Sequence, residues 1–463
     1  MRRPLRDTTQ LFDQVGTILR DVKANGDAAL KSYEARFDGV TLEHLQVTPA
    51  EIQAAESFLS EALKQAICQA KKNIEAFHRA QVAGKEDGQL FRIETMPGVQ
   101  CWQKSLPIDK VGLYIPGGTA PLFSTVLMLA IPAKIAACRD IVLCSPPDRQ
   151  TGQIHPAVLY AAQLCGVDKI FKLGGVQAIA AMAYGTESVP QVYKIFGPGN
   201  QFVTAAKQMV SLEDVAIDMP AGPSEVEVIA DESAHPEYVA ADLLSQAEHG
   251  IDSQVLMITD SEALADAVMA ATLEQCKQLP RKDIAEKSLE NSRIIVLAHD
   301  DLMDFTNEYA PEHLIISTKD YVQMAEQVRN AGSVFLGNYT PESAGDYASG
   351  TNHTLPTKAC SRAYSGVSVD SFMKKTTFQE ISAEALQNDL GPIIRIMAEN
   401  EQLFAHANAV AVRMKYYGHQ SIVTKKYSRL VALFLCAGRI RRRSFGISRC
   451  QRESLQRSLQ PLS

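Results

Sequence analysis

The nine cysteines of this 463-residue chain form no C-x-x-C pair and follow no regular spacing. Proteins held together by a disulfide framework place their cysteines in such patterns, so that class of protein is not expected. The first residues also lack the basic and apolar regions of a secretory leader. We therefore expect a protein that works in a reducing compartment, the cytoplasm.

Long apolar runs are missing as well. The longest stretch, residues 122–137, is interrupted by Ser124, Thr125, Pro132 and Lys134, so it does not have the composition of a transmembrane helix. The chain also lacks a positive net charge, and its value of −7 argues against nucleic acid or an anionic membrane surface as a partner. We expect neither nucleic acid nor a membrane among its partners.

The hydrophobic pattern predicts an α/β fold. Residues 7–78 place apolar side chains at helical spacing, and from Lys110 onward short apolar runs alternate with helical segments. This alternation is typical of parallel, doubly wound sheets. We expect two Rossmann-like units, the first inserted between the N-terminal helices and the second, followed by helical spacing again over residues 369–418. The predicted strands cover residues 111–115, 141–144, 169–173, 192–196, 226–230, 255–258, 294–297, 314–316 and 333–336.

Three predicted strands, the first, third and fourth, are followed by loops rich in glycine and proline. These loops read Y-I-P-G-G-T-A-P, L-G-G-V-Q-A-I-A and I-F-G-P-G-N-Q-F. Backbone N–H groups of such loops, placed before a helix, can hold a phosphate. A tight turn without a ligand explains any one of them, but three in one sheet favour a phosphate-bearing ligand. The dinucleotide fingerprint G-x-G-x-x-G is absent, because Phe202 stands at the third glycine position.

The segment L-L-S-Q-A-E-H-G places Gln246 and His249 three residues apart in a predicted helix, where both project from one face. An amide oxygen and an imidazole provide half of a shell for Zn²⁺ or Mn²⁺. Asp346, in G-D-Y-A-S-G-T-N-H, and His406, in F-A-H-A-N-A-V, are candidates for the other half. The alternative is a solvated helix face without a metal, which is the commoner origin of such a pair.

Glu312 and His313 stand side by side in Y-A-P-E-H-L, directly before a predicted strand. If both reach a cleft, they supply two groups able to transfer protons. The alternative is a turn that ends at a strand and has no chemistry. His353, in the same glycine-bearing loop as Asp346, is either a site residue or an ordinary loop histidine.

Together these motifs resemble the histidinol dehydrogenase family. The residues that carry the resemblance are V-G-L-Y-I-P-G-G, K-I-F-G-P-G-N, D-M-P-A-G-P-S-E-V, D-L-L-S-Q-A-E-H-G, P-E-H-L and S-A-G-D-Y-A-S-G-T-N-H-x-L-P-T, in family order over residues 5–418. The resemblance implies oxidation of L-histidinol to L-histidine, the last two steps of histidine biosynthesis. Two NAD⁺ would be reduced in succession, with L-histidinaldehyde held between the two steps.

The resemblance also implies roles for individual residues. His313 would be the base in the first oxidation, and Glu312 would activate water on the aldehyde. The Zn²⁺ ion, replaceable by Mn²⁺, would orient the substrate as a template. Its ligands would be Gln246, His249, Asp346 and His406.

The resemblance further implies that Ser224, Glu401 and His353 bind the substrate together with His313 and the metal ligands. Tyr114, Gln177 and Asn200, one from each glycine loop, would contact NAD. The family forms a homodimer whose C-terminal helical segment crosses to the partner subunit. The predicted segments are a helical start at 1–113, an NAD-contacting domain at 114–225, a catalytic and metal-bearing domain at 226–368, a helical dimer segment at 369–420 and a tail at 421–463.

Two departures from the family pattern are expected to matter. The N-terminal arm is shorter than in the family, which predicts a weaker dimer or a mis-assigned start. Residues 421–463 contain ten lysines or arginines and one acidic residue, and they read as a basic anchor or, as we favour, as sequence foreign to the family. Two other functions stay open at this stage: a metal hydrolase that uses Glu312 without any nucleotide, and a non-catalytic paralogue that binds metal or nucleotide.

Overall fold

The structure is a computed structural model that describes residues 3, 9–84, 88–117, 121–212, 214–219 and 222–416. The chain divides into two compact units, one formed by residues up to Arg92 together with Trp102–Phe378, the other by Ile93–Cys101 and the residues from Gln379 onward. The predicted tail at 421–463 lies outside the described residues. None of the described helices is long and apolar enough to cross a membrane.

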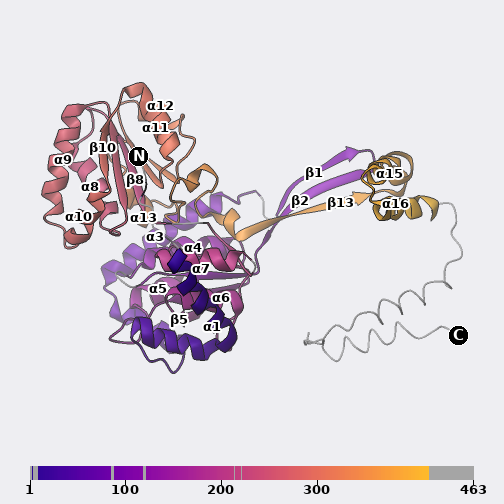
Figure 1. Cartoon of the computed structure of the whole chain (residues 1–463), viewed down its shortest axis with the longest axis horizontal. Coiled ribbons are helices and arrows are strands. Elements are labelled where there is room, and N and C mark those ends of the chain that lie inside the picture. Colours follow the sequence, from indigo (N-terminus) through magenta and orange to yellow (C-terminus); the bar gives the residue numbers. More distant parts are fainter. Residues whose placement is uncertain are drawn as a thin grey trace. The chain divides into compact units, whose positions relative to one another are not determined.

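The first unit contains two parallel sheets of five strands each (Figure 1). The first sheet has the order β5-β4-β3-β6-β7, and the second has the order β10-β9-β8-β11-β12. In the first sheet the strands are β3 (Lys110–Tyr114), β4 (Asp140–Ser145), β5 (Lys169–Lys172), β6 (Lys194–Phe196) and β7 (Ala216–Ile217). In the second they are β8 (Glu225–Ala230), β9 (Gln254–Thr259), β10 (Arg293–Val296), β11 (His313–Ser317) and β12 (Ser333–Leu336). All predicted strands are confirmed to within a few residues, and the α/β fold class is confirmed.

Helices cover both faces of the first sheet, as expected of a doubly wound fold. One hydrophobic core joins the sheet to α3 (Glu61–Ala80), α4 (Phe123–Ile135) and α5 (Pro156–Leu164). A second core, on the other face, joins it to α1 (Thr9–Tyr33), α6 (Gly175–Tyr184) and α7 (Gln201–Ser211). The helices α4 and α6 therefore lie on opposite faces of this sheet.

The second sheet is built in the same way. One core packs it against α8 (Pro236–Ala247), α9 (Glu262–Cys276) and α10 (Lys282–Glu290), and another against α11 (Leu302–Tyr309) and α12 (Tyr321–Ala325). Strands β8 and β11 are central, so both are buried along their whole length. Parallel strands covered on both faces read as largely apolar runs, and the sequence pattern located β11 and, despite Glu227, β8 in this way.

The N-terminal helices begin at residues suited to that position. Thr48 starts α2 (Pro49–Ala55) with a capping box, in which its side chain accepts from the Glu51 amide and the Glu51 carboxylate accepts from the Thr48 amide. Ser60 caps α3 in a similar manner.

The connecting turns are η1 (Glu34–Asp38), η2 (Glu56–Phe58), η3 (His299–Asp301), η4 (Cys360–Arg362) and η5 (Val369–Phe372). A short helix, α13 (Glu342–Tyr347), follows β12.

The prediction of continuous helix over residues 369–418 is wrong in its first part. β13 (Met373–Ile381) pairs with β2 (Val99–Pro107), which pairs with β1 (Gln89–Met96), in a sheet of three strands. No residue of β13 is buried, so no apolar alternation marks it as a strand. Helix follows as predicted in α14 (Ala383–Ala385), η6 (Leu386–Leu390), α15 (Gly391–Asn400) and α16 (Phe404–Tyr416).

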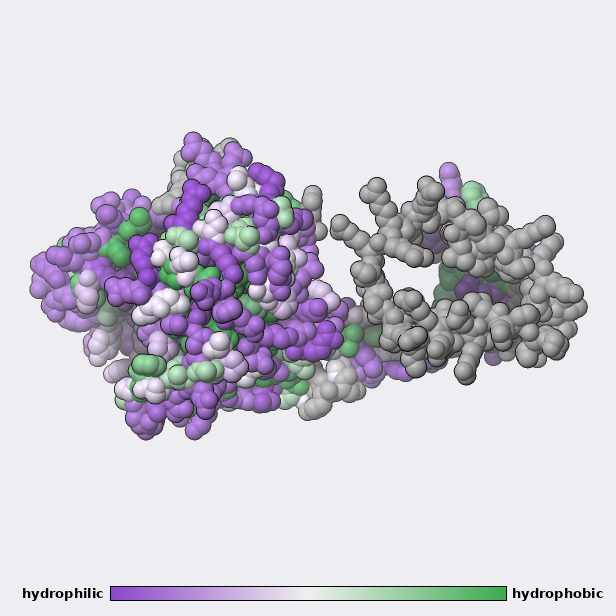
Figure 2. All heavy atoms as spheres, turned by 90° about the horizontal axis from the view of Figure 1, so that it is seen from below, coloured by the Kyte–Doolittle hydropathy of each residue, from purple (hydrophilic) through white to green (hydrophobic). Residues whose placement is uncertain are grey.

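Figure 2 shows one face of the molecule, on which hydrophilic side chains cover most of the first unit and hydrophobic ones are scattered. In the second unit, exposed apolar residues are concentrated on α15 and α16 and in the short turn between these helices. They are Ile393, Ile396, Met397, Leu403, Phe404 and Val412. Clusters of exposed apolar residues are typical of surfaces that bind another protein, a membrane or a ligand. All seven cysteines among the described residues are free thiols.

Candidate active site

Glu312 and His313 lie at the amino end of β11, the strand between β8 and β12. His313 is the first residue of β11 and pairs in register with Val226 of β8 and Ser333 of β12. The exposed fractions of Glu312 and His313 are 6% and 4%. The β11 register therefore fixes both groups in a buried position at the amino edge of the second sheet.

The side chain of Gln246, near the end of α8, contacts His313. Its Nε2 lies 3.0 Å from His313 Nδ1 and donates to the Glu225 carbonyl at 3.3 Å. Its Oε1 is buried and has no hydrogen-bond partner. Gln246 therefore presents an unpaired acceptor atom in the same buried region as His313.

His249 does not lie in the helix, contrary to the prediction from its spacing. The helix α8 ends at Ala247, and the His249 amide donates to the Gln246 carbonyl at 3.2 Å, which extends the turn beyond the helix. The side chain of His249 reaches solvent. The protein around the ring lowers the His249 pKa, because partial burial disfavours the charged imidazole.

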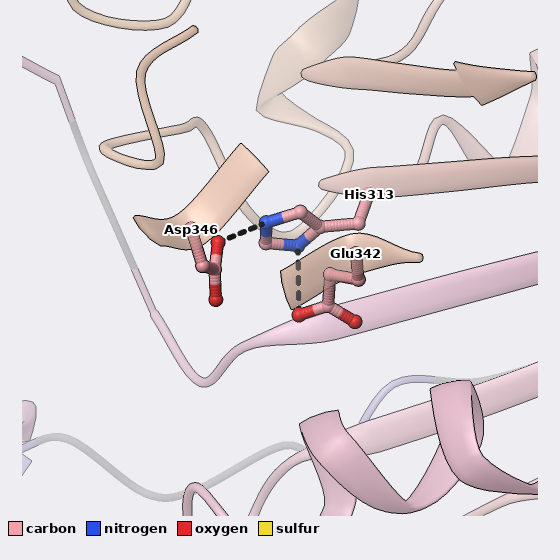
Figure 3. Close-up of side chains that lie close together, drawn as sticks. All are labelled: His313, Glu342 and Asp346. Carbon is pink, nitrogen blue, oxygen red and sulfur yellow. Dashed lines mark ion pairs between the residues drawn. The ribbon is translucent and has the colours of Figure 1, made fainter. Parts of the chain in front are cut away.

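Asp346 approaches the other ring nitrogen of His313. It lies on α13, and its Oδ1 is 3.5 Å from His313 Nε2 (Figure 3). Glu342, one turn earlier on α13, places Oε1 4.0 Å from His313 Nδ1. Ligand atoms of His313, Glu342 and Asp346 all lie within 4.8 Å of one another, close enough to share a metal ion. Glu342 was not predicted, although its i, i+4 spacing to Asp346 was a usable signal.

The unpaired atoms at this cluster fit a cation. Gln246 Oε1 and Glu342 Oε2 are buried without a hydrogen-bond partner, while Asp346 Oδ1 and His313 Nε2 form an ion pair with each other at 3.5 Å. Buried polar atoms are nearly always paired, so two unpaired acceptor oxygens beside this ion pair fit a site for a cation. Oxygen and imidazole donors are those that Zn²⁺ and Mn²⁺ accept.

Burial and charge set the protonation of these groups. Burial raises the pKa of Glu312 to about 8, and it does the same for Glu342. Burial alone would lower the pKa of His313, but the carboxylates of Glu342, Glu312 and Asp346 outweigh it and raise that pKa to about 10. Glu312 is oriented by the Glu225 amide, which donates to its Oε2 at 2.8 Å.

The remaining predicted substrate residues are placed in different ways. His353 is half-buried, with Nδ1 2.9 Å from the Asp346 carbonyl and Nε2 3.3 Å from Thr125 Oγ1 at the start of α4. Ser224 directly precedes β8 and is half-buried. Glu401 and His406 belong to the second unit, where both are exposed.

The predicted NAD contacts lie at the carboxyl ends of strands in the first sheet. Tyr114 ends β3 at the point where the strand order reverses, which is the usual ligand position in such sheets. Its hydroxyl accepts from the Gly175 amide at 3.1 Å. Gln177 is buried in α6, whereas Asn200 is exposed and caps α7 by accepting from the amides of Phe202 and Val203.

Comparison with known proteins identifies the family. A family model described as histidinol dehydrogenase matches residues 1–414. The chain belongs to the histidinol dehydrogenase family. The predicted family is therefore confirmed, and the chain is an enzyme of the NAD-dependent oxidoreductase class to which histidinol dehydrogenases belong.

Relatives in this family are similar over most of their length. The histidinol dehydrogenase of Bacteroides thetaiotaomicron is 64% identical over 416 residues, which cover 89% of this chain and 95% of that protein. The histidinol dehydrogenase of Xanthomonas euvesicatoria is 54% identical over 417 residues, with the same coverage of 89% and 95%. The crystal structure of histidinol dehydrogenase from Elizabethkingia anophelis is 52% identical and covers 90% of this chain and 95% of its own, with a TM-score of 0.85.

Proposed function

We propose that this histidinol dehydrogenase oxidises L-histidinol to L-histidine through L-histidinaldehyde, with two successive hydride transfers to NAD⁺. The observation that carries the proposal is the buried cluster in which Glu312, His313, Gln246 and Asp346 meet within one member of this family. Two proton-transferring groups side by side suit two oxidations in one site. We further propose residues 114–225 as the NAD-contacting domain and residues 226–368 as the catalytic one.

We propose that Zn²⁺, or Mn²⁺ in its place, is held by Gln246, His249 and Asp346 together with His406 of a second subunit. The unpaired buried oxygen of Gln246 and the carboxylate of Asp346, both close to His313, support this set. When bound, the metal would orient the imidazole and amine of the substrate as a template. Glu342, which shares the cluster, is the alternative carboxylate ligand.

We propose that His313 takes the alcohol proton in the first oxidation. Its Nε2 faces Asp346 Oδ1 at 3.5 Å within the same buried cluster. The neighbouring carboxylates hold the His313 pKa high. When a bound cation neutralises these carboxylates, the imidazole can lose its proton more easily and act as a base near neutral pH.

Glu312 is proposed to activate the water that adds to the aldehyde before the second hydride transfer. A carboxylate whose pKa is raised to about 8 is a stronger base than an ordinary glutamate. The Glu225 amide fixes one of its oxygens, so the other can face a water molecule. Ser224, His353 and Glu401 are proposed to complete the substrate pocket, with Tyr114, Gln177 and Asn200 contacting NAD.

The stoichiometry of NADH formation tests this proposal. With L-histidinol, the purified enzyme is expected to form two NADH per substrate, to lose this activity on chelation and to regain it with Zn²⁺ or Mn²⁺. NADH formation can be followed by absorbance against a titrated amount of L-histidinol. A folded, metal-loaded protein that forms no NADH would contradict the proposal and favour the metal hydrolase, for which release of a hydrolysis product would be measured instead.

We also propose that the enzyme is a homodimer and that each site combines both subunits. The exposed apolar residues of α15 and α16 support an interface on the second unit, which also carries Glu401 and His406. Glu312→Gln and His406→Asn variants are each expected to be inactive. After subunit exchange, their mixture should recover roughly a quarter of the wild-type activity, because a heterodimer then has one intact site.

Sedimentation establishes whether exchange has occurred, and a mixture of Glu312→Gln with His313→Gln is the control. Both changes in that control fall on the same half of the site, so no recovery is expected. Recovery in the control, or none in the first mixture after exchange, would contradict a shared site. An active species that sediments as a monomer would do so as well.

A further inference from the structure

Arg3, near the amino terminus, forms an ion pair with Glu225, the first residue of β8 and 222 residues away in the sequence. Arg3 Nε donates to Glu225 Oε1 at 2.6 Å, and Arg3 Nη2 donates to Glu225 Oε2 at 3.0 Å. The two side chains are 20% and 4% exposed. The planar guanidinium matches the carboxylate in this bidentate geometry and gives the buried charge of Glu225 its partner.

The same guanidinium also holds the end of α11. Its Nη2 donates to the Tyr309 carbonyl at 2.7 Å and lies 3.5 Å from the Ala310 carbonyl oxygen. The guanidinium carbon lies 4.1 Å from the centre of the Tyr309 ring. Tyr309 is the last residue of α11, where carbonyl groups lack partners within the helix and carry partial negative charge. Arg3 therefore caps α11 in addition to pairing with β8.

The backbone that Arg3 caps leads directly to the proposed bases. Ala310 has a φ of +53°, a left-handed conformation that residues other than glycine rarely adopt. Glu312 and His313 follow two and three residues later. Such a turn persists only where its surroundings hold it. Arg3 binds the carbonyl of the residue before the turn, and Ser361 Oγ donates to the Ala310 carbonyl at 3.0 Å.

The contact of Arg3 with Glu225 reaches the same bases from the neighbouring strand. The Glu225 amide donates to Glu312 Oε2 at 2.8 Å, and the Glu225 carbonyl oxygen lies 3.2 Å from His313 Nδ1. The Lys358 amide donates to Glu225 Oε1 at 3.2 Å, so the carboxylate is held from a second side. Arg3 thus binds both backbone segments that fix the two bases.

We propose that Arg3 is a positioning residue for both oxidation steps, because it ties the start of β8 to the end of α11. The inference rests on the roles proposed above for Glu312 and His313. A displacement of about 1 Å in a reacting group can lower a rate by about 10²-fold. The planar fork of arginine suits these contacts, whereas the single nitrogen of a lysine cannot reproduce their geometry.

Arg3→Ala is expected to lower kcat with L-histidinol by about 10- to 100-fold in the full-length, metal-loaded enzyme. The KM for NAD should stay within about twofold, because the loss falls on the positions of the bases. Both oxidations should slow, so the product ratio should remain two NADH per L-histidinol. Oxidation of L-histidinaldehyde, supplied as the substrate, should slow by a similar factor. Loss of Glu312 would instead stop the reaction after one NADH.

Two further measurements test the part played by the guanidinium group. Arg3→Lys keeps the charge without the fork, so its kcat should lie between those of the wild type and Arg3→Ala. Guanidinium chloride at a low, non-denaturing concentration should restore part of the kcat of Arg3→Ala, because the free ion can make the same contacts. Sodium chloride at equal concentration controls for ionic strength.

Arg79→Ala is the matched control. Arg79 also contacts a carboxylate, that of Glu75, through two nitrogens, at 2.9 and 2.5 Å, but on α3 and with a side chain that is 65% exposed. Exposed pairs of this kind contribute little. Arg79→Ala should therefore keep the wild-type kcat and gain nothing from guanidinium.

The outcomes separate this inference from the proposed function. Circular dichroism at the assay temperature measures the folded fraction of each variant. If Arg3→Ala keeps its kcat, loses activity only in proportion to its unfolded fraction, or gains no more from guanidinium than from sodium chloride, the positioning role is wrong and the function stands. If the wild type forms no NADH from L-histidinol, the proposed function and this role of Arg3 both fail.

Discussion

Glu312→Gln is expected to stop the reaction after the first hydride transfer. The variant should lower kcat for the complete oxidation of L-histidinol by about 10²- to 10⁴-fold, the usual contribution of a general base. In a single turnover it should still form one NADH per site, because His313 is unchanged. Rapid-mixing absorbance at stoichiometric enzyme measures that first NADH directly.

The substitution is a mild one for the fold. Glu312 accepts a hydrogen bond from the Glu225 amide through Oε2, and a glutamine oxygen can accept the same bond. Loss of activity in Glu312→Gln is therefore not expected to come from unfolding.

His313→Gln provides the complementary result. It should block oxidation of L-histidinol but keep part of the activity with L-histidinaldehyde as substrate, since Glu312 remains. Glu286→Gln, an exposed residue on α10, is the control and should behave as the wild type. If Glu312→Gln still forms two NADH from each L-histidinol, the assignment of the second step to Glu312 is wrong.

Lys207→Met is expected to lower the free energy of unfolding by about 3–5 kcal/mol, because it leaves a buried carboxylate without its partner. Lys207 Nζ lies 2.5 Å from Asp218 Oδ1, and the two side chains are 5% and 1% exposed. Lys207 also donates to the Gly197 carbonyl at 2.8 Å, while Asp218 Oδ2 accepts from the Gly197 amide at 2.8 Å. Urea unfolding followed by circular dichroism measures the loss.

Lys207 and Asp218 together also bind the backbone of Gly197, a position at which any side chain would clash. Gly197 has a φ of +127°, and a Cβ atom there would lie 2.1 Å from the Tyr114 carbonyl oxygen. The pair therefore holds the β6–α7 loop against the end of β3, so Lys207→Met should weaken NAD binding as well as stability.

Two further variants test the physical cause. Lys207→Met with Asp218→Asn should be more stable than Lys207→Met alone, because the unpaired charge is gone and asparagine can still accept from Gly197. Lys277→Met removes a partner from Glu274 in an exposed pair, with exposed fractions of 68% and 65%, and should cost no more than about 1 kcal/mol. Equal losses in Lys207→Met and Lys277→Met would show that burial of the pair is not the cause.

The sequence predicted most of the sheets because their strands are buried. The central positions of β3, β4, β9 and β11 are all apolar, β8 is interrupted only by Glu227, and the turns between the strands are marked by glycine and proline. The sequence could not predict β13, whose residues are exposed or half-buried. Pairing with β2 stabilises that strand, and pairing between distant segments leaves little trace in a local pattern.

The candidate site was predictable in its residue types but not in its arrangement. Glu312 and His313 were selected as neighbours in the chain, and their burial at the amino end of β11 became visible only with the sheet in place. Glu342 was missed because it stands in a short helix with no other signal than its distance from Asp346. The helix α8 ends at Ala247, before His249. The spacing of Gln246 and His249 in the sequence could not predict this end, because it depends on packing.

The backbone of a single residue, Glu225, links both proposed bases to the second sheet. The Glu225 amide donates to Glu312, and the Glu225 carbonyl accepts from Gln246 and lies 3.2 Å from His313 Nδ1. A slip of β8 against β11 by one residue would turn every side chain of β8 to the other face. It would also displace the Glu225 amide and the Glu225 carbonyl together. Both proposed oxidation steps would then fail at once, so a mutation deep in β8 is expected to look catalytic in an assay although its side chain lies away from the proposed site.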